Sequence, residues 1–579
     1  MDVTSVIREG AQQVQQMLRK ESGDHPLVLE LDLTRGVIDA MPQNPVAMFL
    51  ARQLPSLGAI RRALRTAADD PKVTGLVIDL GALPVQAYVA DELAALIEAF
   101  GEKKPVIAFA SSFGEVSSGL FAFRLAASAA DVWVQPSGAV NLSGVHAQIL
   151  LLRGGLEKLG VSPEFAQRWE YKSAGEQFAG SEVSEANREM TRRLAESLLE
   201  SATDAIAHGR DLSTEQVRTS VDDTMVPAAE ALNRGLIDHV GYRDEVYAWV
   251  RQNWGVDEQI NLQYVQRYAE KHGGGPLAPL LQKTKPAVGV VSVHGAIVSG
   301  ASRPGGPTGE PTAGSDTVCA ALRAAGRDDS VKAVVLRVDS PGGSYVASDA
   351  IRREVLQLRE AGKPVVASMG AVAASGGYFV SMPAAEIIAN PSTLTGSIGV
   401  LAGKLVTQGL VDKLGLVREA VDAGRNAGML SGSQPFTEEQ WDKLNGWLDE
   451  VYTDFTTKAA TDRALPVEAL DAVAKGRVWT GADAAEKGLV DHLGGLDLAI
   501  ERVCALADLD RDAQVVRPVP SLGMLSHLRP SENSESLAAA QASGLPQFSG
   551  WEGLLAFGAG MLGVSHRGVL SMPFDVRIS

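Results

Sequence analysis

Apolar runs and helical stretches alternate along the chain, and the same alternation occurs twice. The first copy opens with the strand-like run PLVLELDLTRGVID at residues 26–39, and the second opens with AVGVVSVHGAIVSG at residues 287–300. In each copy a helical stretch follows, and then a second apolar run that ends at Leu80 or at Asp339. Short apolar runs bounded by turn residues are typical of buried strands. The pattern predicts an internal duplication of one strand and helix alternation.

The correspondence continues to the end of each copy. A helix that begins with Tyr-Val-Ala comes next, at Tyr88 and at Tyr345, and another apolar strand follows it. Both copies close on a turn that contains Asp-His, with His239 in the first and His492 in the second. Because a role in the fold explains why both copies have the histidine, we expect both to be structural. Strands that alternate with helices predict an α/β fold with mostly parallel strands and right-handed crossovers.

Stretches rich in Gly, Pro and polar residues indicate where the domains begin and end. A further loose segment inside the second copy, residues 299–315, predicts a mobile loop. The expected divisions are an N-terminal amphipathic helix at residues 1–25, a first repeat at residues 26–270, a linker at residues 271–285, a second repeat at residues 286–515 and a C-terminal tail at residues 516–579.

Charge and cysteine content exclude several classes of protein. The formal net charge is −17, and no basic run offsets it, so nucleic acid is not an expected partner. Cys319 and Cys504 are the two cysteines, far apart in sequence, which excludes a disulfide framework and a zinc cluster built from cysteines.

The apolar stretches are too short to span a bilayer. No run approaches the roughly 18 apolar residues that a membrane helix needs, and the N-terminus lacks a signal-peptide pattern, so a cytoplasmic location is expected. Residues 3–18 carry apolar side chains at helical spacing, which favours a docking face over a shallow membrane contact because acidic residues offset the basic ones. Residues 550–563 raise the same alternative, so a peripheral membrane contact stays open.

The differences between the copies indicate where chemistry resides. The second copy has DSPGGS at residues 339–344, whereas the first has GALPVQA at residues 81–87. A Gly-Gly pair after a buried strand exposes backbone N–H groups without an intervening Cβ, which is the geometry of an oxyanion hole. Because the first copy lacks both glycines, the turn itself does not require them. Gly342 and Gly343 are therefore candidate oxyanion-binding residues.

Ser375 is the candidate nucleophile. It lies in the segment GAVAASGGYFVSMPA at the start of a predicted helix, where small residues on both sides leave space for a substrate backbone. A serine in this place is commonly a helix cap. The first copy has Ser117 and Ser118 in the matching segment but loses the Ala-Ser-Gly-Gly core, which favours a chemical role for Ser375.

A serine hydroxyl needs a base within hydrogen-bond reach. The second copy offers Asp422 in the relevant segment, whereas the first copy reads WEYKSAG there and supplies Lys172, in a segment that we expect to be strand-like. A lysine that acts as a base must be neutral before the reaction, so its pKa must fall from about 10.4 toward roughly 7 to 8 through burial. The sequence therefore predicts a dry, tightly packed site.

These motifs in this order resemble the signal peptide peptidase A family in its long, duplicated form, which is serine peptidase family S49. The resemblance rests on DSPGGS, on AASGGY around Ser375, on TGSIGV at residues 395–400 and on YKSAGE around Lys172, and it covers roughly residues 26–515. It implies a tandem duplication of a Clp protease/crotonase-like α/β domain, with parallel strands and flanking helices. It also implies a Ser/Lys dyad that is split between the two repeats.

The resemblance assigns a role to each motif. Ser375 is expected to be the nucleophile, Lys172 the general base, and Ser397 the residue that hydrogen-bonds and orients the lysine. The implied activity is endopeptidase cleavage of remnant signal peptides or other apolar peptides through an acyl-enzyme. The implied assembly is a homotetramer, and no metal or other cofactor is required.

The oxyanion hole implied by the resemblance consists of backbone N–H groups. Gly342 or Gly343 is expected to supply one donor, and Gly376 the other.

Two other hypotheses for the function stay open. The same fold family contains crotonases, which bind acyl-CoA and do not need a serine paired with a lysine. A catalytically idle scaffold for membrane proteins is the third, although retention of one complete dyad across two copies argues against it.

Overall fold

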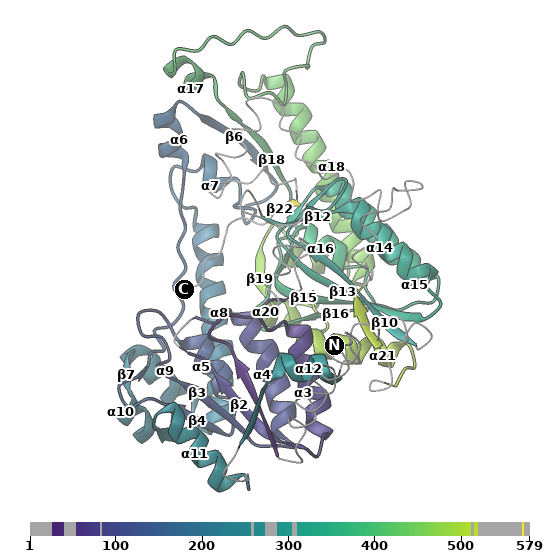
Figure 1. The fold of residues 1–579 in the computed structure, drawn as a ribbon. Coiled ribbons are helices and arrows are strands. Elements are labelled where there is room, and N and C mark those ends of the chain that lie inside the picture. The colour runs from purple at the N-terminus through teal and green to yellow at the C-terminus, as the bar shows by residue number, and fades with distance from the viewer. Residues whose placement is uncertain are drawn as a thin grey trace, which may run out of the picture.

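The computed structural model describes residues 26–39, 54–81, 84–255, 260–272, 286–303, 310–510, 515–518 and 570–571. The expected N-terminal helix, most of the expected linker, part of the expected mobile loop and the apolar segment at residues 550–563 lie outside these ranges. Two sheets, one from each copy of the alternation, lie at the centres of the lower and upper parts of the molecule (Figure 1).

The first sheet has the strand order β8-β4-β3-β2-β1-β9, and every neighbouring pair is parallel. Its strands are β1 (Leu27–Asp32), β2 (Val73–Asp79), β3 (Val106–Ala110), β4 (Asp131–Val134), β8 (His239–Val240) and β9 (Asn261–Tyr264).

The second sheet has the order β19-β17-β15-β13-β10-β21, with β16 and β20 attached beside β15. Its pairs are parallel apart from β17 with β19. Its strands are β10 (Ala287–His294), β13 (Val331–Ser340), β15 (Val365–Ala374), β16 (Glu386–Ala389), β17 (Leu394–Gly396), β19 (Val478–Thr480), β20 (His492–Leu493) and β21 (Val515–Pro518).

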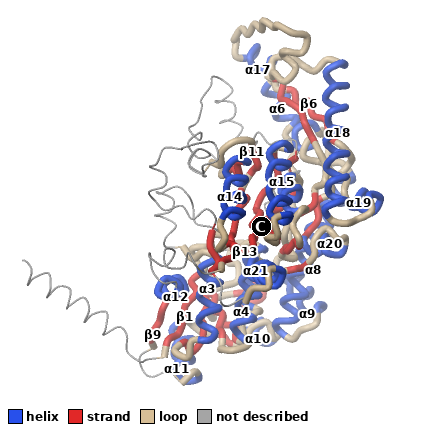
Figure 2. Tube along the Cα trace, turned by 90° about the vertical axis from the view of Figure 1, so that its right-hand side faces the viewer, coloured by secondary structure: helices blue, strands red, loops and turns tan. Residues whose placement is uncertain are grey.

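Helices cover both sheets. In Figure 2 the helices α14 and α15 lie beside the strands of the second sheet, as α3 and α4 do for the first. The helices of the first part are α3 (Leu57–Asp69), α4 (Ala87–Gly101), α5 (Leu120–Ala126), α6 (Arg153–Leu159), α7 (Glu176–Ala179), α8 (Glu185–Arg210), α9 (Thr214–Asp223), α10 (Ala228–Asn233), α11 (Arg243–Asn253) and α12 (Val265–His272). Those of the second part are α14 (Ser315–Arg327), α15 (Tyr345–Glu360), α16 (Gly376–Ser381), α17 (Gln408–Lys413), α18 (Glu438–Asp462), α19 (Val467–Val473), α20 (Gly481–Glu486) and α21 (Leu496–Leu506).

The predicted α/β duplication is confirmed. The order β1-α3-β2-α4-β3 in the first part recurs as β10-α14-β13-α15-β15 in the second. Apolar side chains pack between each helix and its sheet. Ile60 on α3 and Ile351 on α15 are examples, and both are fully buried. His239 and His492 lie at matching places, on the short edge strands β8 and β20 that pair with β4 and β16.

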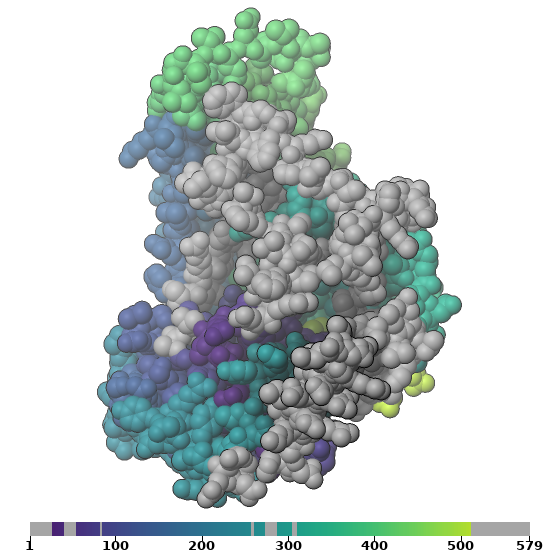
Figure 3. Space-filling view, viewed as in Figure 1, coloured from purple at the N-terminus to yellow at the C-terminus, as the bar shows by residue number. Residues whose placement is uncertain are grey.

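The two parts are also joined by a ribbon that projects from the body. Strand β6 (Ser162–Gln167) of the first part pairs antiparallel with β18 (Leu401–Val406) of the second, in a register that aligns Gln167 with Leu401. Beyond the pair, the N–H of Arg168 donates to the carbonyl of Val400 over 3.0 Å. In the space-filling view the green segment around α17 caps this projection (Figure 3). The ribbon brings the residues after β6 beside the residues before β18.

Smaller strands complete the architecture. The glycine pair β14 (Gly342–Gly343) lies parallel to β11 (Ala296–Val298), which pairs in turn with β12 (Thr312–Gly314). The remaining short strands are β5 (Ala139–Val140), β7 (Val226–Pro227) and β22 (Leu570–Ser571).

Candidate active site

Ser375 lies where the central strand β15 ends and α16 begins. Its backbone has φ 55° and ψ −112°, a sparsely populated conformation that costs on the order of 1–3 kcal/mol. Its N–H donates to the carbonyl of Gly396 over 2.8 Å, which holds the turn. The side chain makes no capping hydrogen bond to α16. The hydroxyl therefore does not serve as the helix cap that such positions usually provide.

Ser397 occupies the matching position on the neighbouring strand. Strands β15 and β17 run parallel, with Ala374 beside Gly396 in the register. The next residue on each strand, Ser375 or Ser397, has a positive φ, 55° and 50° respectively. Both strands thus turn at the same level, and the two serine side chains are presented at the same end of the sheet.

Lys172 enters this place from the first part of the same chain. Its Nζ lies 2.8 Å from Ser375 Oγ, 2.9 Å from Ser397 Oγ and 3.1 Å from the Ser397 carbonyl oxygen. The segment is not the strand that we expected: β6 ends at Gln167, and Lys172 follows in an irregular turn. The turn is needed because the lysine must leave the ribbon to reach the end of the second sheet.

Burial controls the protonation of Lys172. The side chains of Lys172, Ser375 and Ser397 are each 0% exposed. Burial lowers the pKa of the Lys172 amine well below its usual value of 10.5, because a low-dielectric site disfavours the charged form. All three oxygen contacts of Nζ come from uncharged groups, so none of them restores the charged form.

This protonation state predicts the pH dependence of activity. A lysine with a lowered pKa is neutral above that pKa and protonated below it, and only the neutral amine can accept a proton. We expect kcat/KM to rise with pH through a single step well below 10.5 and then to level off. A pH series of kcat/KM on a peptide whose own groups do not titrate in this range measures the step. A rising limb centred near 10.5 contradicts a buried, neutral lysine.

Two glycines of the second part make room for Lys172. A Cβ built on Gly476 would lie 2.5 Å from the Cβ and 2.6 Å from the N of Lys172. A Cβ on Gly399 would lie 3.2 Å from the Cδ of the same side chain. Such approaches leave no space for a larger residue at Gly476. Sequence reasoning missed both glycines, since their role arises only when the two parts of the chain meet.

Gly476→Ala should displace the lysine. We expect about 10²-fold loss of kcat/KM, because small misplacements of a catalytic group cost this much. Gly362→Ala is the matched control: both glycines have φ 80°, but nothing lies within 4 Å of a Cβ at Gly362. Alanine is strained at a positive φ in both variants, so both should lose stability, and thermal unfolding measures that loss. Equal activity in the two variants contradicts a role for Gly476 in seating Lys172.

The candidate oxyanion glycines lie beside Ser375. A Cβ built on Gly376 would be 3.1 Å from the Cα of Gly342 and 3.1 Å from the N of Gly343, so the three backbones are in close contact. The N–H of Gly342 donates to Ser340 Oγ over 3.2 Å. Of the two glycines of β14, Gly343 therefore has the N–H that is better suited to bind a developing oxyanion.

Contacts between the two parts keep the lysine segment in place. Helix α8, which follows the Lys172 turn, packs against β19 and α20 of the second part. Its Arg193 forms a bidentate pair with Asp483, over 2.8 and 3.0 Å, and its Ser197 shares a 2.6 Å hydrogen bond with Thr480. These contacts hold the segment that carries Lys172 against the part of the chain that carries Ser375.

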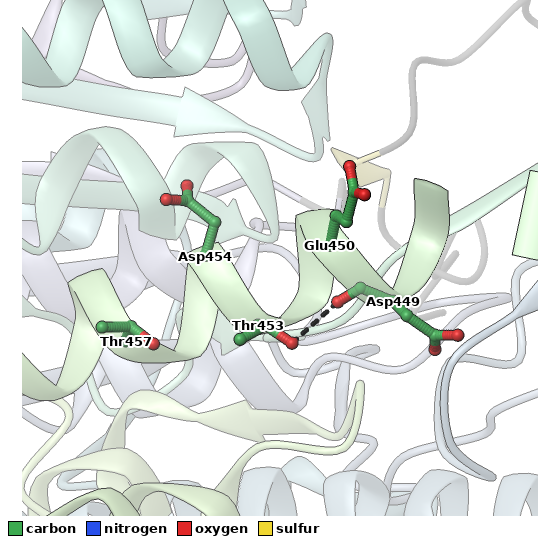
Figure 4. Close-up of a pocket in the computed structure, with 5 residues that line it drawn as sticks. All are labelled: Asp449, Glu450, Thr453, Asp454 and Thr457. Atoms are coloured by element: carbon green, nitrogen blue, oxygen red, sulfur yellow. Dashed lines mark hydrogen bonds between the residues drawn. The ribbon is translucent and has the colours of Figure 1, made fainter. Parts of the chain in front are cut away.

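A hollow of about 530 Å³ lies along α18, and it is lined by Asp449, Glu450, Thr453, Asp454 and Thr457. Figure 4 shows the five side chains spread along this helix, with the hydroxyl of Thr453 donating to the carbonyl of Asp449. Asp454 also accepts a hydrogen bond from Tyr345, the first residue of α15. Its lining includes none of the residues Lys172, Ser375 and Ser397. Across the described ranges, no cluster of three or more His, Cys, Asp or Glu residues is arranged to hold a metal ion.

Comparison with known proteins identifies the family. Residues 98–257 and 357–510 match the family model of "Peptidase family S49", one segment in each copy, and together they span more than half of the chain. The chain belongs to peptidase family S49. It is a serine-type endopeptidase of the signal peptide peptidase type and acts on peptides, which decides against the crotonase and scaffold readings.

Relatives named as proteases cover most of the chain. "Protease 4" of Salmonella typhi is 34% identical over 507 residues, which are 83% of this chain and 78% of that protein. "Serine protease SPPA, chloroplastic" of Arabidopsis thaliana is 32% identical over 75% of this chain and 63% of its own length. Among solved structures, a membrane-bound stomatin-specific protease overlaps 41% of this chain and the whole of its own chain, at 16% identity and a TM-score of 0.26.

In the described part of this S49 peptidase, no helix is long and apolar enough to cross a membrane.

Proposed function

We propose that Ser375 is the nucleophile of this peptidase, that Lys172 is its general base and that Ser397 orients the lysine. The observation that carries the proposal is the 2.8 Å hydrogen bond between Lys172 Nζ and Ser375 Oγ in a fully buried site. A serine becomes an effective nucleophile when a base of suitable pKa lies within hydrogen-bond reach. Burial lowers the pKa of Lys172 well below its usual value, which favours the neutral amine that a general base requires.

Acylation follows from this geometry. Neutral Lys172 accepts the proton of Ser375 as Oγ attacks the carbonyl carbon of the scissile peptide bond. The N–H groups of Gly343 and Gly376 hold the developing oxyanion, with Gly342 closing the turn beside them. The C–N bond then breaks, and Lys172 returns its proton to the leaving amine. A water molecule, deprotonated by the same lysine, hydrolyses the ester and frees Ser375.

Ser397 acts through the lysine. Its hydroxyl and its carbonyl oxygen both contact Nζ, over 2.9 and 3.1 Å, so the lysine is fixed toward Ser375 without a charged partner. A carboxylate in this place would favour the protonated amine and disable the base. A serine supplies orientation and leaves the amine neutral.

Apolar peptides, including the remnants of cleaved signal peptides, are the proposed substrates. Membership of the signal peptide peptidase type supports this substrate class.

The proposed organisation comprises two repeats at residues 26–270 and 286–515, supported by a first sheet between Leu27 and Tyr264 and a second between Ala287 and Pro518. A homotetramer, a cytoplasmic location and a peripheral membrane contact belong to the same proposal.

The substrate class can be tested with matched peptides. The purified chain is incubated with a synthetic peptide that has the apolar core of a signal peptide, and with a peptide of the same length whose core is polar. Mass spectrometry should show cleavage within the apolar core and little cleavage of the polar peptide. Equal cleavage of both peptides rejects the apolar preference, and the Ser375→Ala variant serves as the blank.

A further inference from the structure

The short strand β22 lies on the glycine strand of the site. Leu570 and Ser571 pair antiparallel with Gly343 and Gly342 respectively. The sheet therefore runs β12-β11-β14-β22, and the chain's own C-terminal region supplies its last strand. Strand β22 thus lies at the opposite edge of this small sheet from β12, and it is labelled in the second part of the molecule in Figure 1.

The N–H of Gly343, the proposed oxyanion donor, points toward the edge of β14 that β22 occupies. On the other edge of β14, the N–H of Ser344 donates to the carbonyl of Ile297 in β11 over 2.8 Å. Successive N–H groups along a strand point to opposite edges. The N–H of Gly343 thus points away from β11, toward the edge where Leu570 and Ser571 lie.

This edge is also adjacent to the nucleophile. Gly376, the residue after Ser375, lies so near both glycines of β14 that a Cβ built on it would be 3.1 Å from the Cα of Gly342 and 3.1 Å from the N of Gly343. On the β11 side there is no room for another chain, since a Cβ on Gly343 would lie 2.0 Å from the carbonyl oxygen of Ile297. An extended peptide that reaches Ser375 along β14 must therefore use the edge that β22 holds.

We propose that the segment at Leu570–Ser571 is an internal competitor of the substrate, which docks as a strand on β14 and must leave before a peptide can bind. This proposal rests on the proposed function of Ser375 and the glycines, and it adds a regulatory partner to that site. Extended peptides commonly bind by adding a strand to an exposed sheet edge, where main-chain hydrogen bonds provide affinity. The tail uses the same interaction from within the chain.

The competition should be reversible. A pairing of two residues is marginal alone, but a tethered segment acts at a high effective concentration. If the docked state holds about nine-tenths of the molecules, the apparent affinity for substrate falls about tenfold. The tail then raises KM and leaves kcat unchanged, because the bound substrate reacts in the same site.

Proline substitutions in the full chain test the contact. Proline has no N–H and fixes φ, so L570P/S571P should weaken the pairing with β14, whereas L570A/S571A keeps the backbone donors. We expect the proline variant to have a KM about tenfold lower than the wild type at the same kcat, and the alanine variant to match the wild type. A proline variant with the wild-type KM overturns the proposal, and the peptidase activity itself then stands.

A binding measurement separates this proposal from the proposed catalysis. In the Ser375→Ala background, a fluorescent peptide with the sequence of residues 566–575 should bind the L570P/S571P chain more tightly than the chain with its native tail, by about tenfold in fluorescence anisotropy. This measurement does not depend on turnover, so it shows whether a peptide can bind at the edge of β14 even if no cleavage occurs. Equal binding by both chains, or binding by neither, overturns the proposal.

Discussion

Ser375→Ala is expected to lower kcat/KM for an apolar peptide by about 10³-fold or more, because loss of a catalytic nucleophile leaves only the contribution of binding and of the oxyanion hole. The substitution removes one oxygen atom from a strained turn whose backbone hydrogen bond, from the N–H of residue 375 to Gly396, does not involve the side chain. The fold should therefore survive, and thermal unfolding checks this.

Ser381→Ala is the matched control for the nucleophile. Ser381 is a fully buried serine on α16, the helix that Ser375 begins, and its hydroxyl donates to the carbonyl of Gly377 over 2.8 Å. We expect this variant to lose at most a modest amount of stability and to keep its activity. If both serine variants retain wild-type activity, Ser375 is not the nucleophile.

Lys172→Met is expected to lower kcat/KM by about 10³-fold or more, since the serine loses its base and no other titratable group contacts Oγ among the hydrogen bonds of the described site. Methionine is unbranched and flexible, so it can fill the space of the lysine stem beside Gly399 and Gly476. The variant should also lose the pH-dependent step in any residual activity. A residual step at the same pH assigns that titration to another group.

Lys404→Met controls for the loss of a buried lysine. Lys404 lies on β18 of the same ribbon, where burial also lowers its pKa, and its Nζ donates to the carbonyl of Met429 over 2.8 Å. This lysine has no contact with the serines in the hydrogen bonds of the described residues. We expect wild-type kcat/KM from this variant. Equal losses in the two lysine variants point to a general effect of removing buried amines.

Much of the fold could be predicted from the pattern of apolar runs. Strands such as β13 and β15 are long, apolar and bounded by turn residues, so their positions follow from local sequence. The duplication made each copy a check on the other. It also drew attention to Ser375 and Lys172, because the first copy lacks the Ala-Ser-Gly-Gly core around Ser375 and the second copy has no lysine in the segment that matches Lys172.

The rest of the site depends on contacts between distant segments. The role of Gly476 appears only where its backbone meets Lys172, and this meeting is set by the cross-pairing of β6 with β18. No local pattern marks an irregular turn that must carry a lysine from one part of the chain to the other. The pairing of Leu570 with Gly343 is likewise a contact between segments that are far apart in sequence. Apolar periodicity reports local burial and cannot report such register.

The most direct test of the central claim is covalent labelling of the serine by an alkyl fluorophosphonate, followed by peptide mapping in a mass spectrometer. We predict that the wild type carries one label, on Ser375, and that Lys172→Met reacts about 10³-fold more slowly at the same residue, while Lys404→Met reacts at the wild-type rate. A label on a different serine, or labelling of Ser375 at the same rate with and without Lys172, contradicts a Ser375–Lys172 dyad.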